Sequence, residues 1–246
     1  MPRIAFLPLI ALLLGAAPLG AVGEGTPPHP DRAGLTLSQR FEALLERVKY
    51  EQKRLTSLEA EFVQEKASEF LASPETSLGS LVFASPDRVR WEYREPKPIS
   101  LVIVDDVMLT WYRDVGRAER VTVGRLSSQV FQYLNASGSL ESLLRYFRAT
   151  VSFPADREPY RIELVPRFAR VARRLASMTL WIDRELFLPV RVRYVEPNGD
   201  VTEYRLEKVR VNQPVAAGRF ELELPADVEV REIDLDGGGP DAKPPL

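Results

Sequence analysis

Hydrophobic and polar side chains alternate along much of this chain, and that alternation predicts a protein dominated by β-strands. The clearest example is residues 78–98 (LGSLVFASPDRVRWEYREPKP), where two alternating runs flank a Ser85-Pro86-Asp87 turn. In the second run Val89, Trp91 and Tyr93 fall on one side, while the intervening residues are charged. This segment therefore predicts a β-hairpin with one apolar face.

The same alternation predicts further strands, and Pro197-Asn198-Gly199-Asp200 predicts a tight turn because Asn-Gly readily adopts positive φ. About ten to eleven antiparallel strands with polar outer faces curl towards a barrel without having to close it. We therefore expect an α+β protein built on a curled, unclosed antiparallel β-barrel. The additional strands are expected at residues 58–65, 101–105, 108–113, 117–123, 160–165, 175–183, 188–195, 201–211 and 220–224.

Helical spacing of apolar residues predicts three amphipathic helices, which we expect to form a lid over the inner face of the sheet. The first begins at Thr36-Leu37-Ser38-Gln39, which has the spacing of a capping box, and ends near Leu55. Its apolar stripe consists of Leu37, Phe41, Leu44, Leu45 and Val48. The second and third helices lie near residues 126–134 and 140–147. The lid residues that we expect to face the sheet are Phe41, Leu44, Val130, Phe131, Leu134, Leu143 and Phe147.

The N-terminus has the layout of a secretory signal peptide: a basic start, an apolar run of about a dozen residues and small residues up to Gly23. That run is shorter than the roughly 20 residues needed to cross a membrane. We expect residues 1–23 to be a cleaved signal, 24–34 a flexible Pro-rich leader, 35–233 one domain and 234–246 a disordered tail. The predicted location after cleavage is the periplasm.

Composition excludes several kinds of chemistry. The chain has no cysteine, so disulfides, thiol catalysis and an N-terminal lipid anchor on cysteine are excluded. Its single histidine, His29, lies in the leader, where we expect nothing to hold it beside a base or a metal. A formal net charge of −2 gives no overall electrostatic footprint for nucleic acid or an anionic membrane.

Two carboxylate pairs are the remaining candidates for acid–base catalysis. Asp105-Asp106 also fits a turn, and Glu59 with Glu61 also fits a solvated strand face. We therefore expect no enzyme activity, no cofactor and no metal.

The large apolar residues expected on the strands point instead to a protein that binds a ligand. The residues expected on the inner faces of the strands either fill an ordinary core or line a cavity between sheet and lid. A cavity would suit acyl chains, because removing about a dozen methylenes from water is worth roughly 10 kcal/mol. The candidate cavity residues are Phe62, Val89, Trp91, Tyr93, Leu101, Ile103, Leu109, Trp111, Leu180, Ile182, Val192 and Tyr194.

The order and spacing of several motifs resemble LolA-type periplasmic lipoprotein carriers over residues 35–231. The first is Phe62-x-Gln64, followed by Gly79-x-Leu81-x-Phe83-x-x-Pro86 and Trp91-x-Tyr93-x-x-Pro96. Three later motifs continue the match: Val104-Asp105 with Leu109 and Tyr112, Pro197 to Thr202, and Asn212 with Phe220 and Pro225-Ala226-Asp227-Val228.

The resemblance implies an open barrel with a helical lid, working as a monomer that carries lipoprotein acyl chains. It implies two partners, an inner-membrane ABC exporter and an outer-membrane lipoprotein receptor. Ser85 stands where such carriers keep an arginine that ties the lid shut, and Asp106 stands where a glycine is common. Two alternatives stay open: a carrier of another lipid, such as a glycolipid or polyene, and a sensor or scaffold of the same fold that binds a protein.

Overall fold

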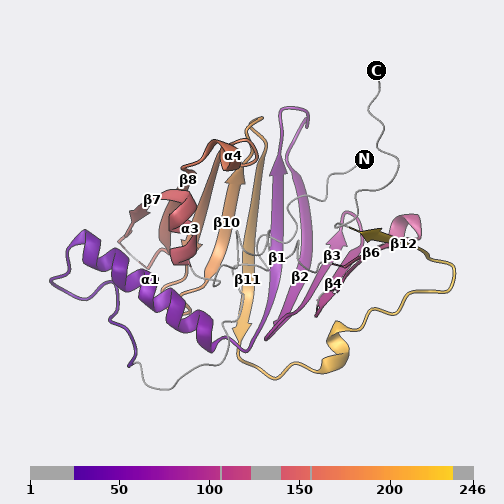
Figure 1. The fold of residues 1–246 in the computed structure, drawn as a ribbon, viewed down its shortest axis with the longest axis horizontal. Coiled ribbons are helices and arrows are strands. Elements are labelled where there is room, and N and C mark those ends of the chain that lie inside the picture. The colour runs from indigo at the N-terminus through magenta and orange to yellow at the C-terminus, as the bar shows by residue number, and fades with distance from the viewer. Residues whose placement is uncertain (1–24, 106, 123–139, 156, 235–246) are drawn as a thin grey trace.

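The fold is built on one large, mostly antiparallel sheet, seen in a computed structural model that describes residues 25–105, 107–122, 140–155 and 157–234 (Figure 1). Twelve strands lie in the order β12-β6-β5-β4-β3-β2-β1-β11-β10-β9-β8-β7. The predicted α+β class with an open sheet is confirmed, with more strands than expected. The strands are β1 (Ser57–Ala67), β2 (Glu75–Ala84), β3 (Arg88–Glu95), β4 (Ile99–Val104), β5 (Val107–Tyr112), β6 (Arg117–Thr122), β7 (Phe147–Ser152), β8 (Tyr160–Pro166), β9 (Ser177–Ile182), β10 (Pro189–Val195), β11 (Val201–Val211) and β12 (Glu229–Asp234).

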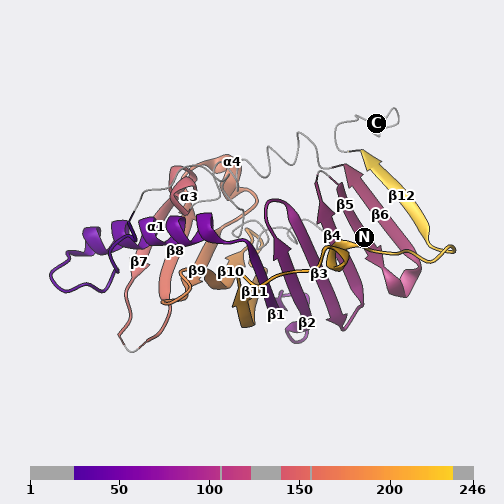
Figure 2. The same ribbon diagram turned by 90° about the horizontal axis from the view of Figure 1, so that it is seen from below.

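The sheet has two arms that meet at its centre. One arm runs from β1 through consecutive hairpins to β6, and the other runs from β7 through consecutive hairpins to β11. β1 pairs with β11 to join the arms, and the last strand, β12, pairs with β6 in parallel. Figure 2 shows how the sheet twists between the two arms.

Two sequence predictions about strands are wrong. Phe147 was predicted to belong to a lid helix, but it is the first residue of β7, because the stretch after it alternates exposed and half-buried side chains. Residues 220–224 do not form a strand. Phe220 instead ends the 3₁₀-helix η4 (Ala217–Phe220), and its ring is buried on the sheet.

Helix α1 (Leu37–Arg54) has the predicted bounds and the predicted capping box. The Gln39 amide donates to Thr36 Oγ1 at 3.3 Å, and the Thr36 amide donates to Gln39 Oε1 at 2.9 Å. Leu44 and Val48 are buried, as the apolar stripe predicted, whereas Leu37 in the first turn is 69% exposed. The stripe therefore contacts the sheet only from the second turn onward.

Helices α1 and α3 (Leu140–Tyr146) cover one face of the β7–β11 arm (Figure 1). Leu44 and Val48 from α1, and Leu140 and Leu143 from α3, join the main apolar core. We call the sheet face that contributes to this core the inner face and the opposite face the outer face. The predicted lid residues Val130, Phe131 and Leu134 lie outside the described residues.

Two short elements complete the described structure. Helix α4 (Ala169–Ala172) links β8 to β9, and the 3₁₀-helix η3 (Arg113–Val115) links β5 to β6. η4 lies on the outer face over β3 and β4. There Phe220 packs with Val82, Ala84 and Val102 in a second, smaller apolar cluster.

Arginines of β3 hold η4 in place. Arg90 Nη1 donates to the carbonyl oxygens of Arg219 at 3.2 Å and Glu221 at 2.9 Å. The Arg88 guanidinium lies 5.5 Å from the centre of the Phe220 ring. The alternation in β3 predicted that these arginines point away from the inner face, and the contacts confirm it.

Candidate functional site

The inner face carries a continuous apolar surface built by cross-strand neighbours. Directly paired residues of antiparallel strands share a face, and Trp91 pairs with Leu101 while Val192 pairs with Leu180. Ten of the twelve candidate residues are buried in the main core, and none of the ten is more than 7% exposed. These ten are Phe62, Val89, Trp91, Tyr93, Leu101, Ile103, Leu180, Ile182, Val192 and Tyr194.

The other two candidates, Leu109 and Trp111, are on the wrong face. In the register of β4 with β5, Leu101 pairs with Thr110, so the inner face of β5 carries Thr110 and its neighbours two positions away. Trp111 points to the outer face, where the Arg113 guanidinium lies 4.6 Å from the centre of its ring. Because β5 is apolar on both faces, alternation alone could not show which of its residues face the inner side of the sheet.

Four aromatic rings form the centre of the inner face: Phe62 of β1, Trp91 and Tyr93 of β3, and a fourth ring that sequence reasoning missed. The ring of Phe62 lies 4.9 Å from Trp91 and 5.0 Å from Tyr93, measured between centroids. Tyr204 of β11 completes the cluster, edge-on to Trp91 at 5.9 Å. The alternation of Thr202, Tyr204 and Leu206 in β11 was the available signal.

The polar atoms in this aromatic cluster are neutral. The hydroxyls of Tyr93 and Tyr204 lie 3.4 Å apart, and burial raises the pKa of both far above the ordinary value for tyrosine. The indole N–H of Trp91 is buried and makes no hydrogen bond with any residue that the structure describes. The surface therefore offers apolar contacts and a few uncharged polar groups.

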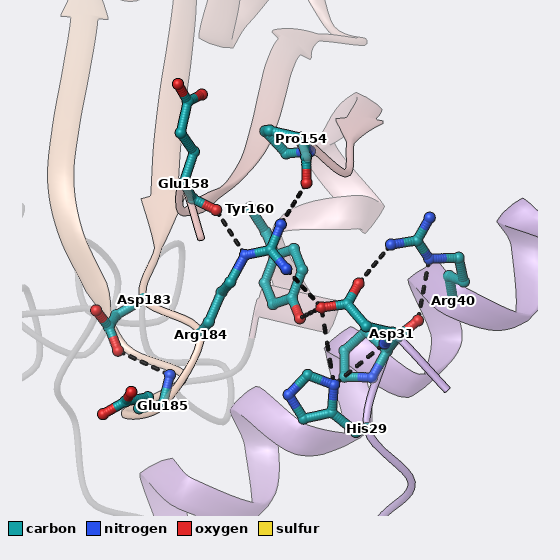
Figure 3. Close-up of polar contacts among 10 residues, drawn as sticks. His29, Asp31, Arg40, Pro154, Glu158, Tyr160, Asp183, Arg184 and Glu185 are labelled. Carbon is teal, nitrogen blue, oxygen red and sulfur yellow. Dashed lines mark hydrogen bonds and ion pairs between the residues drawn. The ribbon is translucent and has the colours of Figure 1, made fainter. Parts of the chain in front are cut away.

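The leader holds helix α1 against the sheet at the far end of the inner face (Figure 3). Asp31 accepts hydrogen bonds from Tyr160 Oη of β8 at 2.6 Å, Arg40 Nη2 of α1 at 2.5 Å and Arg184 Nη1 of the β9–β10 turn at 2.6 Å. Arg184 also donates to the carbonyl oxygens of Glu158, at 2.7 Å, and Pro154. One carboxylate thus joins the leader, the helix, strand β8 and the β9–β10 turn.

Part of the leader expected at residues 24–34 therefore packs on the domain, and His29, which was expected to lie beside neither a base nor a metal, has contacts of its own. His29 lies 3.8 Å from Asp31 Oδ2, and its ring packs edge-on against Phe187 at 5.5 Å. Burial alone would raise the pKa of Asp31, but the hydrogen bonds from Tyr160 and Arg40 and the charge of Arg184 lower it below 3.8. Asp31 is therefore ionised at neutral pH.

The outer face is charged and mostly paired. Glu59 contacts Arg210 at 2.6 Å and Glu61 contacts Lys208 at 2.9 Å, which supports the solvated-face interpretation of these two acids. They line an outer groove of about 510 Å³ beside an irregularity in the pairing of β1 with β11. Among the described residues, no cluster of three or more histidine or acidic side chains could hold a metal ion.

The described residues thus form an open sheet with an apolar, aromatic inner face that helices partly cover. The chain belongs to the LolA family: the family model "Outer membrane lipoprotein carrier protein LolA" matches residues 53–223. Within the described residues, no helix is long and apolar enough to cross a membrane.

Two curated relatives support this assignment. An outer-membrane lipoprotein carrier protein of Alkalilimnicola ehrlichii is 28% identical over 239 residues, which cover 96% of this chain and 97% of the relative. A protein of the same name from Halorhodospira halophila is 29% identical over 67% of this chain and 74% of its own length. An uncharacterised conserved protein of Thermus thermophilus shares the fold, with a TM-score of 0.51 at 13% identity over 79% of this chain and all of that chain.

Proposed function

We propose that this protein carries lipoproteins through the periplasm by shielding their acyl chains between the inner face of the sheet and the covering helices. After export, it would accept cargo from an inner-membrane ABC exporter and deliver it to an outer-membrane receptor. Membership of the LolA family and the names of two relatives support the carrier role. No step requires a catalytic group, a cofactor or a metal.

The observation that carries the proposal is the position of the aromatic cluster. Trp91 is 1% exposed and lies among Phe62, Tyr93 and Tyr204 on the face that α1 and α3 partly cover. In this closed arrangement the rings pack against one another. An acyl chain would therefore enter only when a covering helix moves away from the sheet, and its methylenes would replace contacts that the helix makes.

The three tryptophans of the chain allow a direct test of where an acyl chain binds. Trp91 lies on the inner face, whereas Trp111 and Trp181 lie on the outer face beside arginines. A variant with Trp111→Phe and Trp181→Phe keeps Trp91 as its only tryptophan. A matched variant with Trp91→Phe and Trp181→Phe keeps Trp111.

We expect a doxyl-labelled fatty acid to quench the fluorescence of Trp91 strongly and that of Trp111 little, because quenching requires near contact. Equal quenching of both, or of neither at saturating probe, would contradict an inner-face acyl site. The cargo is tested separately: the protein should release a lipoprotein from inner-membrane vesicles in the presence of ATP. Quenching of Trp91 without release would favour a carrier of another lipid.

A further inference from the structure

The connection between β8 and β9 concentrates positive charge at one end of the sheet. Residues 164–182 contain four arginines and no aspartate or glutamate, although the whole chain has a formal net charge of −2. The nearest acid before this stretch, Glu163, is already ion-paired with Arg161. Residues 164–182 are therefore a locally basic segment in a chain whose net charge is slightly negative.

The short helix α4 gives this region two distinct sides. Val171 packs against the main core and Leu175, four positions later, is 7% exposed. Arg170 lies three positions before Arg173 and four before Arg174, so it shares a side of the turn with each of them, and all three are exposed. The segment is amphipathic, with its apolar side anchored in the protein and its basic side exposed.

An aromatic ring lies at the edge of the basic side. Phe168, the N-cap residue of α4, is 53% exposed, and its ring touches Tyr146 of α3 at a centroid distance of 6.3 Å. Arginines beside a half-exposed aromatic ring are the combination that favours the interface of an anionic bilayer, where the ring enters the headgroup region and the cations meet phosphates. Figure 1 places α4 at one end of the β7–β11 arm, near α3.

We propose that Phe168, Arg170, Arg173 and Arg174, here called the α4 patch, dock the protein on anionic phospholipid headgroups. This inference goes beyond the proposed carriage of lipoproteins and does not depend on it. It assigns to the chain a reversible contact with the membrane surface itself. Because α3 contacts Phe168 through Tyr146, docking would take place next to one of the helices that cover the inner face.

The test compares binding of the protein to sedimented vesicles of phosphatidylcholine alone and of phosphatidylcholine with an equal part of phosphatidylglycerol. The wild-type protein should bind only the anionic vesicles, and about 0.5 M NaCl should release it. The triple variant Arg170→Gln/Arg173→Gln/Arg174→Gln should bind at least roughly tenfold more weakly. The control Arg32→Gln/Arg157→Gln/Arg193→Gln removes the same charge from exposed positions elsewhere and should bind like wild type.

Two further variants separate a lipid surface from an acidic protein as the partner. A bilayer tolerates point charges, so Arg170→Lys/Arg173→Lys/Arg174→Lys should retain vesicle binding, whereas geometric pairing with protein carboxylates would weaken. Phe168→Ser should reduce vesicle binding more than Phe70→Ser, although Phe70 is 81% exposed.

Unchanged melting temperatures would show that each variant folds. Equal binding by both glutamine variants, binding to uncharged vesicles, or capture only of an acidic protein would overturn the proposal.

Discussion

The ring of Phe62 lies over Gly79, its direct partner on the neighbouring strand. A β-carbon added at Gly79 would come within 2.3 Å of Phe62 Cζ and 2.1 Å of the Glu92 carbonyl oxygen. Both distances are far below van der Waals contact, and one of them involves backbone that cannot move aside. The absence of a side chain at position 79 therefore lets the aromatic cluster sit close to the sheet.

Replacing Gly79 by alanine should destabilise the protein severely, by about 3 kcal/mol or more, because the new methyl group meets a backbone oxygen and a packed ring. Gly218→Ala is the control, since nothing lies within 4 Å of a β-carbon at that position. Urea unfolding followed by circular dichroism measures both. A Gly79→Ala protein as stable as wild type would mean that the ring of Phe62 is packed elsewhere.

Trp91 and Trp111 should differ in their contribution to stability, although they are only two strands apart. Trp91→Ala should cost about 3–5 kcal/mol, because it removes a fully buried ring from the aromatic cluster. Trp111→Ala should cost about 1 kcal/mol, mainly the contact of Arg113 with an outer-face ring. Chemical denaturation of the two variants provides the measurement, and equal losses would contradict the assignment of their faces.

The contribution of Asp31 should depend on pH with a defined sign. Its pKa is lower in the folded protein than the ordinary 3.8, so the ionised carboxylate stabilises the fold above that value. Asp31→Asn should therefore cost about 2 kcal/mol at neutral pH, where charged hydrogen bonds are lost. The difference between wild type and variant should shrink as the pH falls below 3.8 and through the lower folded pKa.

Stability curves of wild type and Asp31→Asn between pH 7 and about pH 2 test this expectation. Both should also be measured in a His29→Gln background, which removes the imidazole that lies 3.8 Å from the carboxylate. A difference that grows as the pH falls would show that Asp31 is stabilised in its protonated form.

Arg90→Ala should loosen the segment that crosses the outer face without unfolding the sheet. Two hydrogen bonds from Arg90 to backbone carbonyls of residues 219 and 221 disappear in this variant. Hydrogen exchange of the Arg219 and Glu221 amides, which bond within η4, should accelerate by roughly tenfold or more. Arg193→Ala, an exposed arginine of β10, should leave both rates unchanged.

Sequence patterns predicted the fold best where alternation was strict. In β3 every second residue is apolar, and both the apolar face and the outward arginines were assigned correctly. In β5 the run Val107-Met108-Leu109-Thr110-Trp111-Tyr112 is apolar on both sides, so only the register with β4 revealed which side faces inward. Strand β12, which pairs with β6 in parallel, was not predicted.

The contacts that hold the leader (residues 24–34) against the sheet could not be predicted from sequence patterns. A Pro-rich stretch with one histidine is typical of a flexible segment, and nothing local in it indicates a partner. Asp31 is held by Tyr160 and Arg184, residues more than a hundred positions later, so its role emerges only when the sheet brings those strands together. Among its contacts, Arg40, nine positions away, and His29, two positions away, are the ones near to it in the sequence.

The pairing of β1 with β11 also has a consequence for the order of events when the chain is made. Each arm of the sheet is a series of hairpins between consecutive strands, but Leu58 finds its partner only at Val211, close to the end of the chain. Contacts between such distant residues form slowly, because a long loop must close before any pairing energy is gained. The pairing of β1 with β11 should therefore form later than the hairpins within each arm, so the two arms can become ordered before they join.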